Sequence, residues 1–266
     1  MQQKTISYKH STINYRIFGS GSEVVFGFHG YGEHAGTFAV LEKFIAESHT
    51  IVAIDFPFHG NTIWNEDLLF TPFVLLEILQ SINPFPEKKF SLMGYSMGGR
   101  IALKMLELYP SQIKKLVLLA PDGFHNNFWH WLSTQTFIGN KLFKICMHYP
   151  QPMFWLMEGA YKLSLFNKSV YNFVKSYLIE KESRLILYKR WTTLRKFYPD
   201  LKLIQKELTE QKIKMELVFG KYDKIILTKR GLTFQEPVKS FVIVTELEAG
   251  HQLLKEKYAQ QIASFL

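Results

Sequence analysis

Short apolar runs alternate along the first half of this chain with segments in which apolar positions recur at helical spacing. Runs of this length, bounded by polar or glycine-containing stretches, are typical of buried strands. They predict an opening hairpin of 4–8 and 13–18, followed by strands at 23–28, 50–54, 90–94, 113–120, 215–220 and 240–247. Helical patterns are found at 38–47, 97–109 and 253–266. Strands that alternate with helices favour an α/β fold with a mostly parallel sheet.

From residue 124 to about residue 200 the pattern changes. This segment is rich in Trp, Phe, Tyr and Met and has no strand alternation, which indicates a helical insertion. Its large apolar residues include Phe128, Trp129, Trp131, Phe137, Phe143, Phe154, Trp155, Met157, Tyr161 and Phe166. We therefore expect a core domain formed by residues 1–123 and 201–266, with residues 124–200 inserted into it as a helical cap.

Composition and charge narrow the functional classes. A chain of 266 residues with 47% hydrophobic content can bury the full core of one α/β domain. The formal net charge is +9, but the basic residues of 181–230 are interspersed with apolar positions at helical spacing. That distribution is typical of a solvated helical face, so we expect no nucleic-acid partner.

The cysteine count and the hydropathy of the chain indicate in which cellular compartment the protein is expected. Cys146 is the single cysteine, which excludes an intramolecular disulfide, and it has none of the Cys/His spacing of a metal site. The N-terminus lacks the apolar run of a secretory signal, and no apolar stretch reaches the ~18 residues of a membrane-spanning helix. We expect a soluble, cytoplasmic protein with no integral membrane association and no metal. Adhesion of the Trp-rich segment at 124–200 to a membrane surface stays open as a weaker alternative.

The sequence Gly94-Tyr-Ser96-Met-Gly98 carries the sharpest chemical signal. It has the form G-x-S-x-G and lies between an expected strand and an expected helix, which is the context of a nucleophile on a tight turn. The flanking glycines remove side chains that would clash in such a turn. Ser96 is therefore the candidate nucleophile.

A serine hydroxyl needs a base, and the base needs an acceptor that orients it. His251 follows the last expected strand, and Asp223 follows the strand before it, so both are expected at the carboxyl edge of the sheet with Ser96. Asp122, after the strand at 113–120, is the alternative acid. The chain order of serine, aspartate and histidine is the one that accompanies this serine motif.

Acyl transfer also needs backbone donors for the developing oxyanion. The N–H of Met97, at the start of the helix, is one candidate. The second is the N–H of Tyr31, in the glycine-flanked segment that follows the strand at 23–28. The Tyr31 side chain could equally cover a pocket.

Taken together, these motifs make the chain similar to the α/β-hydrolase superfamily over nearly its whole length. Five segments of this chain occur in the same order as in the family: His29-Gly30, the segment from Asp55 to Gly60, the Ser96 turn, the turn at Asp223 and Gly250-His251. The resemblance implies an eight-stranded, mostly parallel sheet with a helical cap inserted after the sixth strand. It also implies supporting roles for His29, Gly30, Asp55 and His59.

Two positions depart from the family pattern. Phe58 occupies a position where the family often has glycine, and Thr228 stands where a proline is common. Neither change removes a catalytic group. We expect them to alter the shape of loops and the fit of the substrate.

The expected reaction is hydrolysis of an ester or thioester of a small, largely apolar substrate through an acyl-enzyme, without a cofactor. Candidate substrate contacts are Tyr95, Arg100, Trp129 and Trp155. Arg100 also supports an alternative, a lyase reaction. The segment from Gly94 to Arg100 resembles the turn at the nucleophile of 2-succinyl-6-hydroxy-2,4-cyclohexadiene-1-carboxylate synthase, a lyase whose matching arginine contacts an anionic substrate. C–C bond hydrolysis and a non-catalytic ligand receptor are further alternatives.

Overall fold

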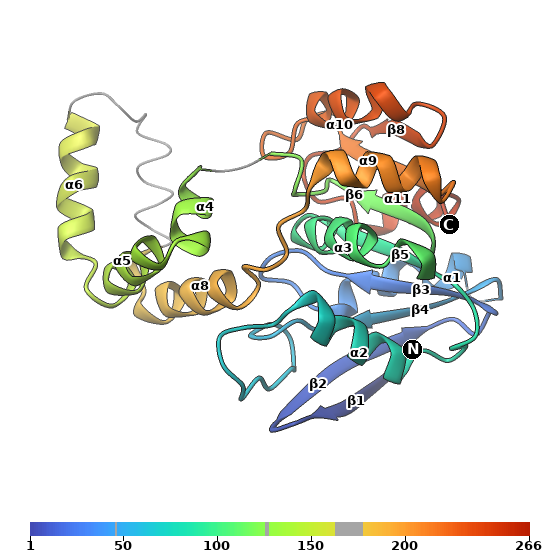
Figure 1. Ribbon diagram of the computed structural model, residues 1–266, viewed down its shortest axis with the longest axis horizontal. Coiled ribbons are helices and arrows are strands. Elements are labelled where there is room, and N and C mark those ends of the chain that lie inside the picture. Colours follow the sequence, from blue (N-terminus) through green and yellow to red (C-terminus); the bar gives the residue numbers. More distant parts are fainter. Residues whose placement is uncertain (46, 126–127, 163–177) are drawn as a thin grey trace. The chain divides into compact units, whose positions relative to one another are not determined.

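The computed structural model describes residues 1–45, 47–125, 128–162 and 178–266 (Figure 1). It divides into two compact units. The first unit consists of Met1–Glu66, Phe70–His125 and Lys196–Leu266, and the second of Asp67–Leu69 and Asn126–Arg195. Of the helices in the described ranges, none combines the length and the apolar character needed to cross a bilayer.

The first unit is built on an eight-stranded sheet in the order β1-β2-β4-β3-β5-β6-β7-β8. The hairpin β1/β2 is antiparallel and joins β4 antiparallel, whereas all pairs from β4 to β8 are parallel. The strands are β1 (Gln2–Tyr8), β2 (Ser11–Phe18), β3 (Glu23–Phe28), β4 (His49–Ile54), β5 (Phe90–Tyr95), β6 (Ile113–Leu119), β7 (Lys214–Gly220) and β8 (Val242–Leu247). The predicted sheet is confirmed.

Burial follows strand position. β5 is buried along its whole length and β3 along all but its first residue, because helices cover both faces of the central sheet. β1 lies at the edge and is mostly exposed.

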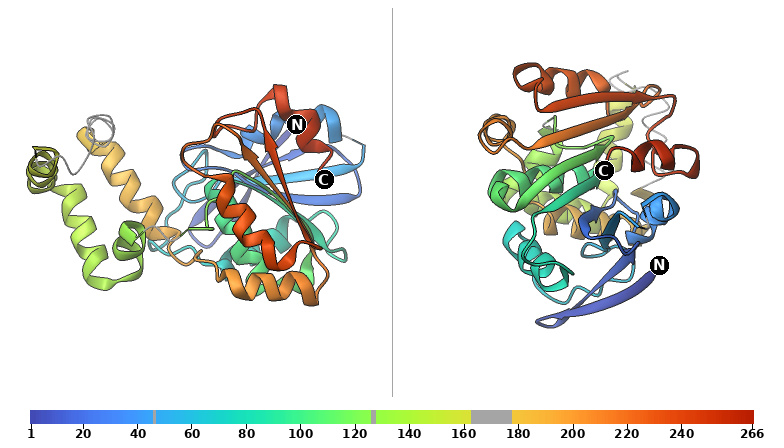
Figure 2. Two further views of the ribbon diagram at one scale, coloured as in Figure 1. Left: turned by 90° about the horizontal axis from the view of Figure 1, so that it is seen from above. Right: turned by 90° about the vertical axis from the view of Figure 1, so that its right-hand side faces the viewer.

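Two helical layers flank this sheet (Figure 2). One contains α2, α3 and α9, which follow one another in contact, and the other contains a 3₁₀ helix with α1 and α11. The bounds are Ala35–Leu41 for the 3₁₀ helix, Glu42–Ile45 for α1, Pro72–Ile82 for α2, Met97–Leu108 for α3, Leu201–Glu210 for α9, Thr228–Gln235 for α10 and Glu256–Ala263 for α11.

Helix boundaries differ from the expectations at three places. The segment expected as one helix at 38–47 is a 3₁₀ helix followed by the short α1, and the last helix begins only at Glu256. Helix α2 is absent from the sequence-based expectations. The pair Thr71-Pro72 is nevertheless typical of the start of a helix. In the structure the Thr71 hydroxyl accepts from the N–H of Val74 at 3.2 Å, and Pro72 occupies the first turn.

The second unit is helical, and most of it lies in the chain between β6 and β7. Its helices are α4 (Phe128–Gln135), α5 (Phe137–His148), α6 (Gln151–Lys162) and α8 (Lys181–Thr193). Met147, Leu178 and Tyr188 form its buried centre. Phe166 and the side chain of Tyr161, named above among the apolar residues, lie outside the described residues.

A buried arginine ties the second unit together. Arg184 is 6% exposed, and its guanidinium donates to the carbonyl oxygens of Met147, Leu178 and Ile179 at 3.1, 2.8 and 2.6 Å. The planar guanidinium carries several donors, so one side chain satisfies backbone groups from the end of α5 and from the chain before α8.

Candidate active site

Ser96 stands on the turn between β5 and α3, with φ of 50°. A positive φ is unfavourable for a residue with a Cβ, and here the neighbouring packing holds it. A Cβ added at Gly98 would lie 1.9 Å from the carbonyl oxygen of Phe28, and one at Gly94 would lie 2.5 Å from the carbonyl oxygen of Gly98. The two glycines therefore let the turn pack tightly against β3.

A chain of two hydrogen bonds connects Ser96 to Asp223. The Nε2 atom of His251 lies 3.0 Å from the Ser96 hydroxyl oxygen, and Nδ1 lies 2.7 Å from Oδ2 of Asp223. With Nδ1–H donating to the carboxylate, Nε2 is left as the acceptor that faces the hydroxyl. The three residues expected from the sequence thus meet in the first unit.

The Asp223 carboxylate is fixed on both oxygens. Oδ1 accepts the backbone N–H groups of Ile225 and Ile226 at 2.7 and 3.0 Å, and the side chain is fully buried. These bonds hold Oδ2 against His251.

Asp122, the alternative acid, has different partners. Its Oδ1 accepts from the N–H of Gly123 at 2.8 Å, and its Oδ2 lies 3.6 Å from Nη1 of Arg100. Arg100, the candidate anion-binding residue, is therefore paired with a carboxylate of its own chain. Of the two candidate acids, Asp223 is the one in contact with His251.

The loop after β3 passes beside Ser96. A Cβ added at Gly30 would lie 3.0 Å from the Tyr95 ring and 3.5 Å from the Cβ of Ser96. Met97 is the first residue of α3, so its N–H has no acceptor within the helix. The N–H of Ser96 donates to the carbonyl oxygen of Leu119 at 2.9 Å, which leaves that group out of any oxyanion hole.

Asp55 is buried, and its carboxylate accepts several hydrogen bonds. Its carboxylate accepts from Asn14 Nδ2 at 2.7 Å, from the N–H of Ala35 at 2.5 Å and from the N–H of Asn61 at 2.8 Å. It thereby joins β2, the start of the 3₁₀ helix and the loop that follows β4. Its bonds are structural and do not reach Ser96.

His29 and His59 are also buried, with ring centroids 5.0 Å apart. His29 Nδ1 donates to the carbonyl oxygen of Gly30 at 2.7 Å, and Nε2 accepts from the N–H of Phe56 at 3.2 Å. His59 Nδ1 donates to the carbonyl oxygen of Pro57 at 3.0 Å, and its ring meets that of Tyr31 edge-on. These contacts fix the loop that carries Tyr31.

Phe58 has φ of 63°, in the left-handed region that glycine adopts without strain. The position where the family resemblance led us to expect glycine thus has a backbone conformation typical of glycine, despite its bulky side chain. Holding a non-glycine residue there costs about 1 kcal/mol.

Glu33 is a site residue that the sequence reasoning missed. It lines a cavity of about 220 Å³ with Thr37, Tyr95, Gln252, Leu254 and Lys255. Its Oε2 is buried without a hydrogen-bond partner, and burial raises the pKa of the carboxyl, an effect opposed by the charge of His251. Glu33 comes one residue after Gly32 in the segment His29-Gly-Tyr-Gly-Glu33, but its burial is not readable from that segment.

Tyr95 forms the wall between this cavity and the histidine. Its hydroxyl donates to the carbonyl oxygen of His251 at 3.3 Å, and the two rings lie 5.6 Å apart. Burial, with Glu33 and Asp223 nearby, raises the pKa of the Tyr95 hydroxyl. It therefore stays protonated and serves as a hydrogen-bond donor.

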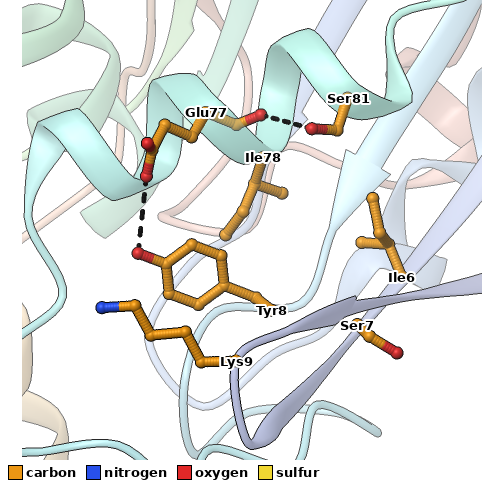
Figure 3. Close-up of a pocket in the computed structure, with 7 residues that line it drawn as sticks. All are labelled: Ile6, Ser7, Tyr8, Lys9, Glu77, Ile78 and Ser81. Atoms are coloured by element: carbon orange, nitrogen blue, oxygen red, sulfur yellow. Dashed lines mark hydrogen bonds between the residues drawn. The ribbon is translucent and has the colours of Figure 1, made fainter.

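A second cavity of about 300 Å³ is lined by none of the site residues described above (Figure 3). It is lined by the end of β1 and by α2, where the Tyr8 hydroxyl donates to Glu77 at 3.4 Å. The candidate contacts Trp129 and Trp155 belong to α4 and α6 of the second unit, where they are exposed.

Comparison with known proteins gives a family match. Residues 23–173 match the sequence profile of a family described as "alpha/beta hydrolase fold". A serine hydrolase-like protein of Danio rerio is 36% identical over 98 residues, which are 36% of this chain and 30% of that protein. A Pimeloyl-[acyl-carrier protein] methyl ester esterase of Pseudoalteromonas atlantica is 30% identical over 123 residues, 45% of this chain and 46% of the esterase.

Among solved structures, a thioesterase domain from the curacin biosynthetic pathway has a similar fold, with a TM-score of 0.63 at 18% identity. The match covers 100% of this chain and 98% of that domain. With the two curated relatives, by contrast, this chain shares less than half of their length.

Proposed function

The chain belongs to the α/β-hydrolase family, and we propose that it is a serine hydrolase that cleaves an ester or thioester through an acyl-enzyme on Ser96. The observation that carries this proposal is the continuous hydrogen-bond chain from the Ser96 hydroxyl through His251 to Asp223. An esterase and a serine hydrolase-like protein among the relatives support it.

In the first half of the reaction, the Ser96 oxygen attacks the substrate carbonyl while His251 Nε2 takes its proton. Asp223 stabilises the imidazolium that forms. The N–H groups of Met97 and Tyr31 donate to the oxyanion. When the tetrahedral intermediate collapses, the proton on Nε2 passes to the leaving alcohol or thiol and the acyl group remains on Ser96.

The second half uses the same groups on water. His251 takes a proton from water, whose oxygen attacks the acyl carbonyl, and then returns that proton to the Ser96 oxygen as the ester bond breaks. His29, Gly30, Asp55 and His59 take no part in proton transfer. They hold the loop that presents Tyr31.

The proposed substrate is a small molecule with a largely apolar acyl part. The aromatic side chains of the second unit, including Trp129 and Trp155, are candidates for the acyl contact in a cap-like role for residues 124–200. Tyr95 contributes from the turn itself.

The pairing of Arg100 with Asp122 argues against the lyase alternative, because that reaction requires Arg100 to bind a substrate carboxylate. A succinylated diketo acid, assayed for elimination beside an ester, separates the two activities. Turnover of the diketo acid without ester hydrolysis would favour the lyase.

The experiment that tests the proposal is labelling with a fluorophosphonate probe, read by intact mass, on the wild type and on Ser96→Ala. We expect a single adduct on the wild type and none on the variant. A panel of p-nitrophenyl esters of increasing chain length then sizes the acyl site. A folded wild type that binds small ligands but gives no adduct would support the receptor alternative.

A further inference from the structure

Helix α5 of the second unit has two apolar faces. One face packs inward, with Met147 buried at the centre of the unit and Phe143 against it. The other is formed by Ile138, Leu142 and Ile145 and is extended by Tyr149, the residue directly after the helix; these four are 72%, 55%, 47% and 73% exposed. We call these four residues the α5 stripe.

The members of the α5 stripe follow a spacing of four, three and four residues, which places them on one line along the helix. Exposed large apolar residues also occur on the preceding helix α4, where Phe128 and Trp131 stack. A row of exposed apolar side chains such as the α5 stripe indicates a binding surface.

A basic flank runs beside the α5 stripe. Lys141, Lys144 and His148 are exposed at positions one residue before or after members of the stripe. Between residues 124 and 157 the sequence contains no Asp or Glu at all. The surface therefore combines apolar side chains with positive charge, and the stretch of sequence that forms it contributes no acid.

We propose that the α5 stripe and its basic flank bind the surface of an anionic phospholipid membrane, with α5 lying parallel to it. The stripe would enter the boundary between headgroups and acyl chains, and the lysines would extend their ammonium groups to the phosphates. Trp131 suits the same depth, because its ring is apolar and its N–H is polar.

The positive charge beside the α5 stripe favours an anionic membrane over a second copy of the chain as its binding partner. A two-fold interface places a surface against itself, so Lys141 and Lys144 would be brought near their own positively charged counterparts. An anionic lipid surface instead supplies the complementary charge, and attraction to it amounts to roughly a fivefold gain in binding for each lysine near the surface.

The test is cosedimentation of the full-length protein with vesicles of phosphatidylcholine alone or mixed with phosphatidylglycerol. We expect binding to the mixed vesicles, weakened by salt, and little binding to phosphatidylcholine. Leu142→Ser with Ile145→Ser should reduce the partition coefficient roughly a hundredfold, at about tenfold per side chain. Lys141→Gln with Lys144→Gln should reduce it roughly twentyfold.

Matched controls come from the first unit. Phe73 on α2 and Ile243 on β8 are similarly exposed, at 61% and 53%, so Phe73→Ser with Ile243→Ser should leave vesicle binding unchanged. Lys202→Gln with Lys229→Gln is the control for charge. If either control pair weakens binding as much as its α5 counterpart, binding is non-specific and the proposal is wrong.

Two further results would overturn the proposal in favour of another occupant. A concentration-dependent mass in light scattering that Leu142→Ser abolishes would show that a second copy covers the stripe. Loss of turnover on a water-soluble ester without vesicles, in the stripe variants alone, would show that the stripe covers the first unit. Vesicle binding is measured directly, so its outcome is independent of the proposed hydrolase activity.

Discussion

Asp223 contacts His251 through one carboxylate oxygen, 2.7 Å from Nδ1, while its other oxygen is held by two backbone N–H groups. The carboxylate can therefore neither rotate nor move without losing hydrogen bonds inside a fully buried site. This arrangement fixes the ring of His251 with Nε2 toward Ser96 before any substrate arrives.

Replacing Asp223 by asparagine should therefore affect the chemical step far more than the fold. An amide donor at this position favours the wrong tautomer of the imidazole, so we expect kcat to fall by about 10³- to 10⁴-fold. The measurement is ester hydrolysis with the Tm recorded in parallel. Asp122→Asn is the matched control, because Asp122 pairs with Arg100, and its kcat should stay within about threefold of wild type.

Gly98→Ala should be severely destabilising. The new Cβ would stand 1.9 Å from the backbone oxygen of Phe28, and neither α3 nor β3 can move apart without disturbing the sheet. We expect a loss of more than about 3 kcal/mol in the free energy of unfolding, measured with urea.

Gly159→Ala on the exposed side of α6 is the control for Gly98→Ala. An added Cβ there meets no atom within 4 Å, so alanine should stabilise the helix by about 0.5 kcal/mol. If both variants lost similar stability, crowding at the Ser96 turn would not be the explanation.

The catalytic candidates could be predicted from the sequence, because their positions after strands and beside glycines allow few structural interpretations. Ser96, Asp223 and His251 follow parallel strands, and the carboxyl ends of such strands share an edge, so their meeting could be predicted without coordinates. The glycines around Ser96 indicated close packing for the same reason, because no other residue fits there.

Other features depend on burial, which periodicity does not give. Glu33 is an ordinary acidic residue in the sequence, and only the fold places its carboxyl in a cavity beside Tyr95. Helix α5 has apolar residues on two sides, and spacing alone cannot tell that Met147 packs inward while Ile138 stays exposed. Helix α2 was missed although its buried residues Leu75, Leu79 and Ile82 recur at helical spacing, because apolar residues that are not buried, such as Phe73, lie just before them in the sequence and obscure that period.

Glu33→Gln should stabilise the protein in a pH-dependent manner. Burial raises the pKa of the Glu33 carboxyl above its ordinary value of 4.5, so near that pH the folded state binds more protons than the unfolded state. The free energy of unfolding of the wild type therefore decreases as the pH rises from 4.5 through the folded pKa. Glutamine removes the buried charge, so the variant should gain stability relative to the wild type as the pH rises above 4.5 and show no gain below that pH.

Urea unfolding at several pH values checks this expectation. Glu87→Gln, at an exposed carboxyl, is the control and should give no pH-dependent gain. A gain for Glu33→Gln that is the same at pH 4 and pH 8 would contradict the argument, because an effect of packing alone does not titrate.

Arg184→Met should destabilise the second unit selectively. Methionine fills much of the same space but leaves the buried carbonyl oxygens of Met147 and Leu178, and the partly buried one of Ile179, without this donor. Each unsatisfied buried carbonyl costs about 1 kcal/mol or more, so we expect a loss of about 2 kcal/mol. The measurement is limited proteolysis, in which we expect the variant to be cleaved faster within 126–195 than within the first unit. Lys181→Met, at an exposed position of the same helix, is the control and should leave the cleavage rates of both units unchanged. If the two units were cleaved at equally increased rates, Arg184 would stabilise the whole chain and not the second unit alone.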